Sequence, residues 1–178
     1  AARAVARQWA RRWLAAAPDE GAAHLTASSL DELDGDYASA LREVTVAESL
    51  GVDIPTGTPP LRMVLLGKMG RVSDAARLAD SLTRAGYFGD PNSVLLNLGT
   101  AIPWAFNLAL LSGHADNAQA LLAQTIATFA AVNPGVEQVP AVAFERLLGG
   151  RDPLEEPRIP TALRAQVLDS ALRRAGAL

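Results

Sequence analysis

The chain of 178 residues contains no cysteine, which excludes disulfide bonds, thiol catalysis and thiolate metal sites. Aromatic residues make up only 5% of the sequence, whereas alanine and leucine are plentiful. Such a composition favours close packing of helices over the formation of β-strands. The formal net charge is −3 and no long run of basic residues occurs. We therefore expect no broad electrostatic surface for nucleic acid.

Motifs that carry catalytic or metal chemistry are also missing. His24 and His114 are the only histidines, and their separation does not match the spacing of metal ligands. The acidic run over residues 31–36 lacks the alternating oxygen ligands and closing glutamate of a calcium loop, so it predicts a solvated turn. No phosphate-binding glycine loop, nucleophile elbow or acid/base carboxylate pair stands out. We expect no catalytic residue, metal or cofactor in this chain, and the question stays open for a longer parent protein.

The feature that the chain does contain is a turn that occurs three times. Each copy places an alanine five residues after a glycine, as in Gly35 and Ala40, Gly70 and Ala75, and Gly113 and Ala118. Glycine can adopt the positive φ that ends a helix and reverses the chain. The small alanine lets the two antiparallel helices joined by the turn approach closely, because a larger side chain would overpack their contact. Repetition after 35 and then 43 residues predicts stacked helical hairpins, which are usually binding surfaces.

Apolar periodicity and helix breakers give the expected boundaries of the helices. The predicted helices cover residues 2–17, 19–33, 37–50, 60–69, 73–85, 93–112, 115–132, 136–148 and 161–175. Pro103 should kink or split the helix over 93–112. The last helix is amphipathic, and we expect it to cap the end of the stack.

Three sets of residues carry a resemblance to a known family. They are Gly-Asp-Tyr-x-x-Ala at 35–40 with Val44 and Ala47, Gly-Arg-Val-x-x-Ala at 70–75 with Ala79 and Leu82, and Gly113, Ala118 and Leu122. On these motifs the chain resembles the tetratricopeptide repeat family, in the style of bacterial helical repeats. Ala6 lies 34 residues before Ala40, so residues 2–18 look like the second half of a repeat whose first half is missing. The chain is therefore expected to be a piece of a longer protein. His24 stands where the family typically has tryptophan.

The resemblance implies an all-α fold, a right-handed α-solenoid of about three antiparallel helical hairpins with an orphan N-terminal helix and a C-terminal capping helix. The repeats would cover residues 1–132, divided into a partial unit at 2–18 and full units at 19–50, 60–85 and 93–132, and an irregular helical cap would cover 133–178.

The resemblance also implies a groove lined by the first helix of each hairpin. The residues at the inward-facing positions are Leu25, Thr26, Ser29, Glu32, Leu61, Val64, Lys68, Trp104, Asn107 and Leu111. Part of the family grips the terminal carboxylate of a peptide with lysine, arginine and asparagine, but here only Lys68 and Asn107 are of a suitable type. We therefore expect a mixed apolar groove in which Trp104 is an aromatic anchor. The other interpretation is that Trp104 fills the kink made by Pro103.

Two further segments allow other interpretations. Trp9 and Trp13, together with neighbouring arginines, could stack on the bases of single-stranded nucleic acid, but packing against a preceding helix explains them better. The apolar segment over residues 94–111 approaches the length of a membrane span. Its asparagines, glycine and proline, and the absence of flanking basic residues, favour a buried or partner-facing hairpin instead.

The function expected from these features is a non-enzymatic protein–protein interaction or scaffold module that holds a peptide or a partner domain. The alternative is a regulatory or sensory arm of a larger multidomain enzyme, such as a bacterial protein kinase or a transcription regulator. Self-association stays open, as does the compartment, for which the cytoplasm is preferred.

Overall fold

The computed structural model describes residues 2–52, 58–91, 101–132 and 161–174. Within these ranges the regular secondary structure is entirely helical and includes no strand. The all-α class expected from the composition is thereby confirmed. The expected helix over 136–148 and much of the expected cap lie outside the described residues.

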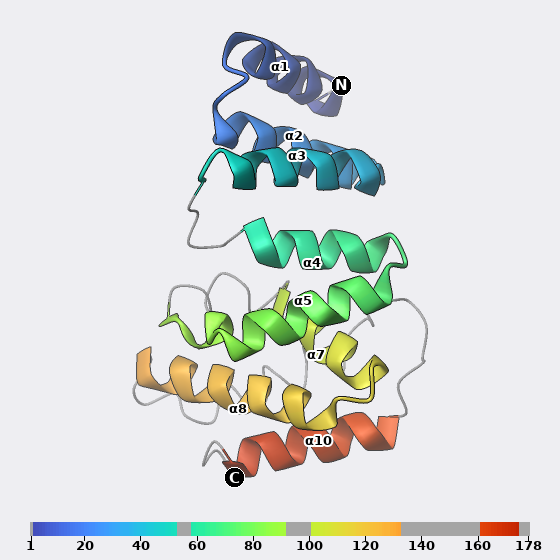
Figure 1. The fold of residues 1–178 in the computed structure, drawn as a ribbon, viewed down its shortest axis with the longest axis vertical. Helices are drawn as coiled ribbons and strands as arrows, with labels where there is room; N and C mark the ends of the chain where they lie inside the picture. The colour runs from blue at the N-terminus through green and yellow to red at the C-terminus, as the bar shows by residue number, and fades with distance from the viewer. Residues whose placement is uncertain (1, 53–57, 92–100, 133–160, 175–178) are drawn as a thin grey trace.

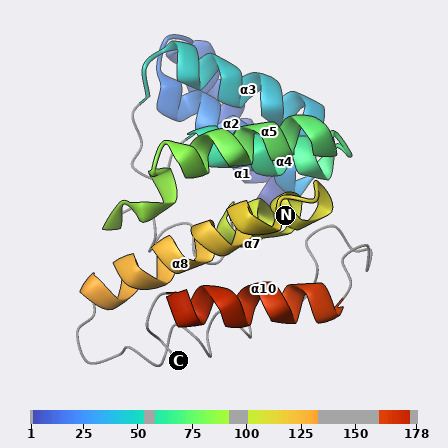
Figure 2. The same cartoon turned by 60° about the horizontal axis from the view of Figure 1, so that its bottom comes forward.

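The helices follow one another in chain order along the long axis of the molecule (Figure 1). They are α1 (Ala2–Ala16), α2 (Gly21–Leu33), α3 (Tyr37–Ser49), α4 (Thr58–Lys68), α5 (Val72–Arg84), the 3-10 helix η1 (Tyr87–Gly89), α7 (Ala101–Leu111), α8 (Ala115–Val132) and α10 (Thr161–Arg174). Each described α-helix packs against the next, and α4 also packs against α7. Figure 2 shows α10 lying along α8, and in Figure 1 these two helices lie at the opposite end of the molecule from α1. The expected boundaries agree within two residues at every helix end that was predicted inside the described ranges.

The three predicted turns have the same backbone geometry. Gly35, Gly70 and Gly113 adopt φ values of +78°, +74° and +75°. At the first turn, the amide of Gly35 donates to the carbonyl of Glu32, and the amide of Asp36 donates to that of Asp31. The same pair of bonds, reaching back three and five residues, recurs at the other two turns. This pattern is a Schellman motif, which satisfies the free carbonyls at the end of each first helix and reverses the chain.

The alanines that follow these turns occupy equivalent places. Ala40, Ala75 and Ala118 are fully buried. Each backbone amide donates to the carbonyl of the residue four positions earlier, which is the residue directly after the turn glycine. Their complete burial agrees with the close packing expected at these alanines, and the close approach of the paired helices there stays a prediction.

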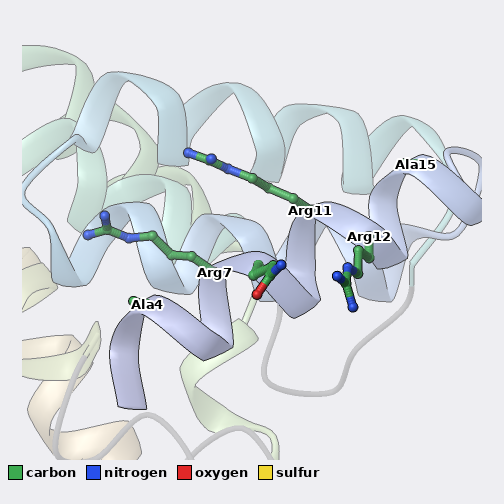
Figure 3. Close-up of a pocket in the computed structure, with 6 residues that line it drawn as sticks. Ala4, Arg7, Arg11, Arg12 and Ala15 are labelled. Atoms are coloured by element: carbon green, nitrogen blue, oxygen red, sulfur yellow. The ribbon is translucent and has the colours of Figure 1, made fainter. Parts of the chain in front are cut away.

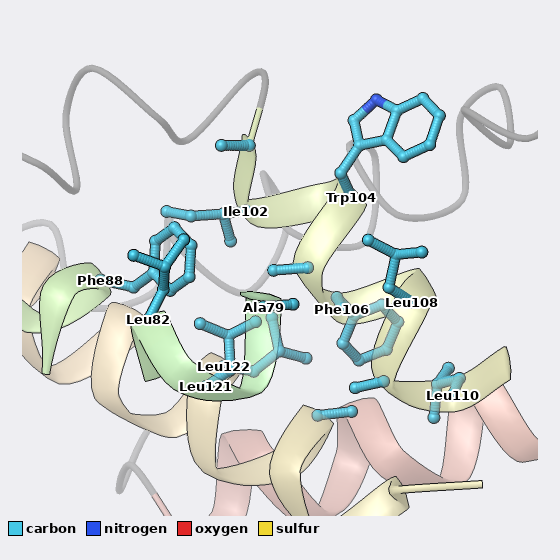
Figure 4. Close-up of a cluster of buried hydrophobic side chains, with 14 of the residues drawn as sticks. Ala79, Leu82, Phe88, Ile102, Trp104, Phe106, Leu108, Leu110, Leu121 and Leu122 are labelled. Carbon is cyan, nitrogen blue, oxygen red and sulfur yellow. The ribbon is translucent and has the colours of Figure 1, made fainter. Parts of the chain in front are cut away.

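The larger apolar core cluster of the described residues begins at α4 and surrounds α7. Every residue from Ala101 to Leu110 in α7 is buried, and the core cluster extends over α4, α5, η1, α8 and α10. Figure 4 shows Leu82, Phe88 and Ile102 close together at one end of this cluster. A smaller cluster of Ala40, Val44 and Leu65 joins α3 to α4. The first hairpin thus has much less apolar burial than the third.

Pro103 is the third residue of α7, within its first turn. A proline destabilises a helix little at that position, because the backbone amides of the first helical turn have no hydrogen-bond partner inside the helix. The expected kink concerns the segment before Ala101, and residues 92–100 lie outside the described ranges, so the kink stays a prediction. None of the helices in the described ranges is long and apolar enough to cross a membrane.

Candidate partner-binding surface

One pair of predicted groove residues, from the first and second hairpins, forms an ion pair. Lys68 Nζ of α4 lies 2.5 Å from Glu32 Oε1 of α2. The same ammonium group lies 5.6 Å from the centre of the Tyr37 ring, at the start of α3. Two residues expected to face a ligand are therefore brought together, and the charge of Lys68 is already balanced by a carboxylate within the chain.

The predicted polar residues of α2 are also satisfied internally. Thr26 Oγ1 donates to the carbonyl of Ala22 at 2.9 Å, and Ser29 Oγ donates to that of Leu25 at 3.0 Å. Such bonds to the preceding helical turn occupy the hydroxyl hydrogen. Leu25 and Leu61 are half-buried and pack against the small cluster between α3 and α4.

The remaining groove candidates lie mostly inside the protein. Trp104 is only 6% exposed, and Asn107 and Val64 are buried, while Leu111 is half-buried. A Cβ atom at Gly67 would lie 2.8 Å from Cε3 of Trp104, so the indole rests directly on the backbone of α4. This geometry agrees with a packing role for Trp104. The role of these residues in binding stays a prediction.

The most exposed large apolar side chains of the described residues are Val5 and Trp9 on α1 and Leu33 at the end of α2, which is also 61% exposed. Val5 is 66% exposed and Trp9 is 61% exposed, and Ala10 is the only buried residue of this helix. Trp13 is half-buried: its ring packs edge-to-face on Trp9 with centres 5.2 Å apart, and its Nε1 donates to Glu20 Oε2 at 2.8 Å. Ala2 and Ala16 are exposed on the same side of the helix. We call Ala2, Val5, Trp9 and Ala16 the α1 stripe.

The arginines of α1 fall into two groups. Arg3 and Arg7 both form ion pairs with Asp34, in the turn between α2 and α3. Arg11 and Arg12 are exposed and form no ion pair within the described residues. α1 contains no acidic residue. Arg11 nevertheless lines the same recess as Asp31, Asp34 and Asp36, so acidic side chains of the described residues lie near it.

Arg11 and Arg12 border an open recess of about 420 Å³ on α1. Its other lining residues are Ala4, Arg7, Gln8 and Ala15, which occupy one side of the helix (Figure 3). Around the helix axis this side lies next to the α1 stripe, because Gln8 and Arg12 are separated from Val5 by three and seven residues. At about 100° per residue Arg12 lies beside the α1 stripe, whereas Arg11 lies on a different side of α1, about 120° from Val5 and about 160° from Trp9.

A second recess, of about 260 Å³, separates α1 from α2. It is lined in part by Leu14, Leu30 and the acidic turn residues Asp31, Asp34 and Asp36. Burial, and then the negative charges of Asp36, Glu43 and Asp34, raise the pKa of Asp31. The contact between α1 and α2 is therefore partly polar, in contrast to the apolar contacts around α7.

His24 connects three elements near this contact. Its Nε2 lies 2.9 Å from the carbonyl of Pro18, before α2, and its Nδ1 lies 2.6 Å from Glu43 Oε2 of α3. Burial alone would lower the pKa of His24, but the two hydrogen bonds and the charge of Glu43 raise it above the ordinary value. Both ring nitrogens face acceptors, so the doubly protonated imidazolium fits this site best.

The described residues contain no group of three or more histidine, aspartate or glutamate side chains that could hold a metal ion. Comparison with known proteins finds no matching family model, no matching curated protein and no matching solved structure. Sequence reasoning considered Trp9 and Trp13 with Arg7, Arg11 and Arg12 only as a surface for single-stranded nucleic acid. It included none of these α1 residues in the predicted partner-binding set.

Proposed function

We propose that this chain is a non-enzymatic protein-interaction module, built as an α-solenoid of helical hairpins that resembles tetratricopeptide repeats. Three equivalent turns, three equivalent buried alanines and packing of each described helix on the next support this architecture. In stacked repeats each unit contacts only its neighbours, so the outer surfaces remain free for partners.

The observation that carries the proposal is the difference in exposed apolar surface between α1 and α10. α10 buries Val167, Leu168 and Ala171 and exposes Gln166 and Asp169, as a capping helix should. α1 instead exposes its large apolar side chains Val5 and Trp9, and Ala10 is its only buried residue. Large exposed apolar side chains that lie together mark a surface for a macromolecular partner. The binding function is therefore assigned to the outer side of α1 and extends to the neighbouring groove.

Site-specific photo-crosslinking in the source cells tests this proposal. A photo-crosslinking amino acid replaces Trp9 in one variant and Gln166, exposed on α10, in a matched control. We expect discrete protein adducts from position 9 and only background from position 166. Absence of adducts at position 9, or the same adducts at both positions, would contradict a binding role for α1. Unchanged far-UV circular dichroism confirms that both variants are folded.

A further inference from the structure

We infer that His24 is a pH-sensitive latch at the joint between α1 and the first hairpin, closed while its imidazole carries two protons and released when the ring becomes neutral. The joint is the short segment over residues 17–20 that connects α1 to α2. His24 is the fourth residue of α2 and holds this segment through the carbonyl of Pro18. This device acts within the chain and does not depend on the proposed binding function.

The two ring nitrogens of His24 both face atoms that can only accept a hydrogen bond. Nε2 lies 2.9 Å from the carbonyl oxygen of Pro18, and Nδ1 lies 2.6 Å from Glu43 Oε2 of α3. The imidazolium form has an N–H at each nitrogen and can donate to both. A neutral ring has only one N–H, so its other nitrogen would turn a lone pair toward an acceptor. Loss of the proton therefore breaks one of the two contacts.

The contact with Pro18 is the one that breaks. The carboxylate of Glu43 carries a full negative charge, and hydrogen bonds to charged groups are stronger than those between neutral groups. A lone pair of Nδ1 beside this carboxylate would also be repelled more strongly than a lone pair of Nε2 beside a neutral carbonyl. The neutral ring therefore keeps its proton on Nδ1 and its bond to α3, and the joint loses its bond to α2.

The charges around His24 decide when the latch opens. Burial, and then the negative charges of Asp36, Glu43 and Asp34, raise the pKa of Asp31, which follows His24 by seven residues on the same side of α2. Arg42 of α3 is the cation that opposes this effect on Asp31. Once the ring is neutral, its positive charge no longer offsets these carboxylates.

The direction of the pH dependence follows from the pKa of His24. Burial would lower this pKa, but the hydrogen bonds to Pro18 and Glu43 and the charge of Glu43 raise it above the ordinary value of 6.5. A group with a raised pKa in the folded state loses its contribution as the pH rises through that pKa. The latch is therefore closed below pH of about 6.5 and opens at higher pH.

The opposite end of α1 is held by ion pairs that do not involve a histidine. Arg3 and Arg7 pair with Asp34, which follows the last residue of α2 and so lies a helix length away from the joint. Trp13 Nε1 donates to Glu20 Oε2, a bond that connects α1 to the joint itself. The recess of about 260 Å³ leaves open space between α1 and α2. Release of the latch therefore lets the C-terminal half of α1 move while Asp34 retains the N-terminal half.

Distance measurement between two spin labels on the 178-residue chain tests the latch. Because the chain has no cysteine, two introduced cysteines are its only labelling sites. One pair replaces Ala15, exposed on α1, and Ala38, exposed on α3. The control pair replaces Ala38 and Ser81, exposed on α5, and does not span the joint. A rise from pH of about 6 to pH of about 9 should broaden and shift the first distance distribution and leave the second unchanged.

Three variants of the labelled chain assign the change to its cause. His24→Gln should give the same distribution at both pH values. His114→Gln, the matched control at the other histidine, should keep the change of the unaltered chain. Glu43→Gln should move the midpoint of the change to lower pH by about one unit, because the charge that favours the imidazolium form is gone. Far-UV circular dichroism at both pH values separates opening of the joint from unfolding of the chain.

Two outcomes would overturn the inference. The first is a distance between positions 15 and 38 that does not respond to pH in the unaltered chain. The second is a response that survives His24→Gln, which would assign it to another titrating group. If His24→Gln does not fold, Glu43→Gln decides: an unmoved midpoint refutes the latch, and a midpoint at lower pH supports it.

Discussion

Substitution of Gly67 by alanine should destabilise the protein, although alanine is the better helix former. A Cβ atom at this position would lie 2.8 Å from Cε3 and 3.3 Å from Cη2 of Trp104, with Cζ3 nearer still. Favourable carbon–carbon contacts begin at about 3.5 Å. The indole is only 6% exposed, so it has no free space into which it can turn. The new methyl group must push α4 and α7 apart or displace the ring.

The size of the effect follows from two opposing terms. Glycine in a helix is less favourable than alanine by as much as about 1 kcal/mol, which Gly67→Ala would recover. Overpacking of a well-filled contact costs about 1–3 kcal/mol. The severe overlap with a buried ring places the cost near the upper part of that range, so we expect a net loss of about 1–2 kcal/mol. For a chain of this size each kcal/mol lowers the melting temperature by about 2–4 °C.

A double-mutant cycle with Trp104→Leu makes the test sharper. Once the ring is gone, the added methyl group meets no obstacle and should stabilise the protein by about 0.5–1 kcal/mol. The sign of the effect of Gly67→Ala therefore reverses between the two backgrounds, with a coupling of about 2 kcal/mol. Urea denaturation followed by far-UV circular dichroism measures the four free energies of unfolding.

Gly70→Ala serves as the control for this cycle. A Cβ atom at Gly70 meets nothing within 4 Å, but the backbone φ of +74° is strained for alanine. It should lose about 1 kcal/mol equally in both backgrounds. If Gly67→Ala stabilises the protein equally with and without the indole, Trp104 does not rest on α4, and its assignment as a packing residue would have to be withdrawn.

Three other predictions concern buried positions. Ala40→Leu and Ala75→Leu should each lower the free energy of unfolding by about 1–3 kcal/mol through overpacking, and unchanged thermal melting of both variants would refute the assigned crossing points. Because His24 has a raised pKa, its contribution to stability should be complete below pH of about 6.5 and should decline as the pH rises through the folded-state pKa. His24→Gln should flatten this part of the stability–pH curve, and an unaltered slope would assign it to another group. Ser28 Oγ is buried without a hydrogen-bond partner in the described residues, so Ser28→Ala should raise the free energy of unfolding by about 1 kcal/mol, and a loss would reveal an unrecognised bond.

The sequence predicted the turns well because they are local. A Schellman motif involves six consecutive residues, and glycine at the fifth is the residue that its positive φ requires. Gly35, Gly70 and Gly113 could therefore be assigned without knowledge of the rest of the fold, and so could the helix ends beside them. The division into domains, the handedness and the solenoid arrangement depend on how hairpins pack over longer distances, and they stay predictions.

The contacts of the predicted groove residues were harder to predict from the sequence, because their partners lie far away along the chain. Nothing in the sequence indicates that Glu32 would bind Lys68, 36 positions later, or that the ring of Trp104 would cover Gly67. Position along a helix indicates which way a side chain faces, but not which neighbour fills the space in front of it. The same limit applied to His24, whose partner Glu43 belongs to the following helix.

The cost of binding favours α1 over the groove as the first point of contact. A ligand that used Lys68 would have to replace its contacts with Glu32 and Tyr37, and one that used Trp104 would have to lift the indole from α4. Affinity is what remains after such costs are subtracted, so a site whose groups already bind each other starts at a disadvantage. On α1 the corresponding internal contact is the edge-to-face packing of Trp9 on Trp13, which still leaves Trp9 61% exposed. A partner that reached the groove would therefore gain most by binding α1 at the same time.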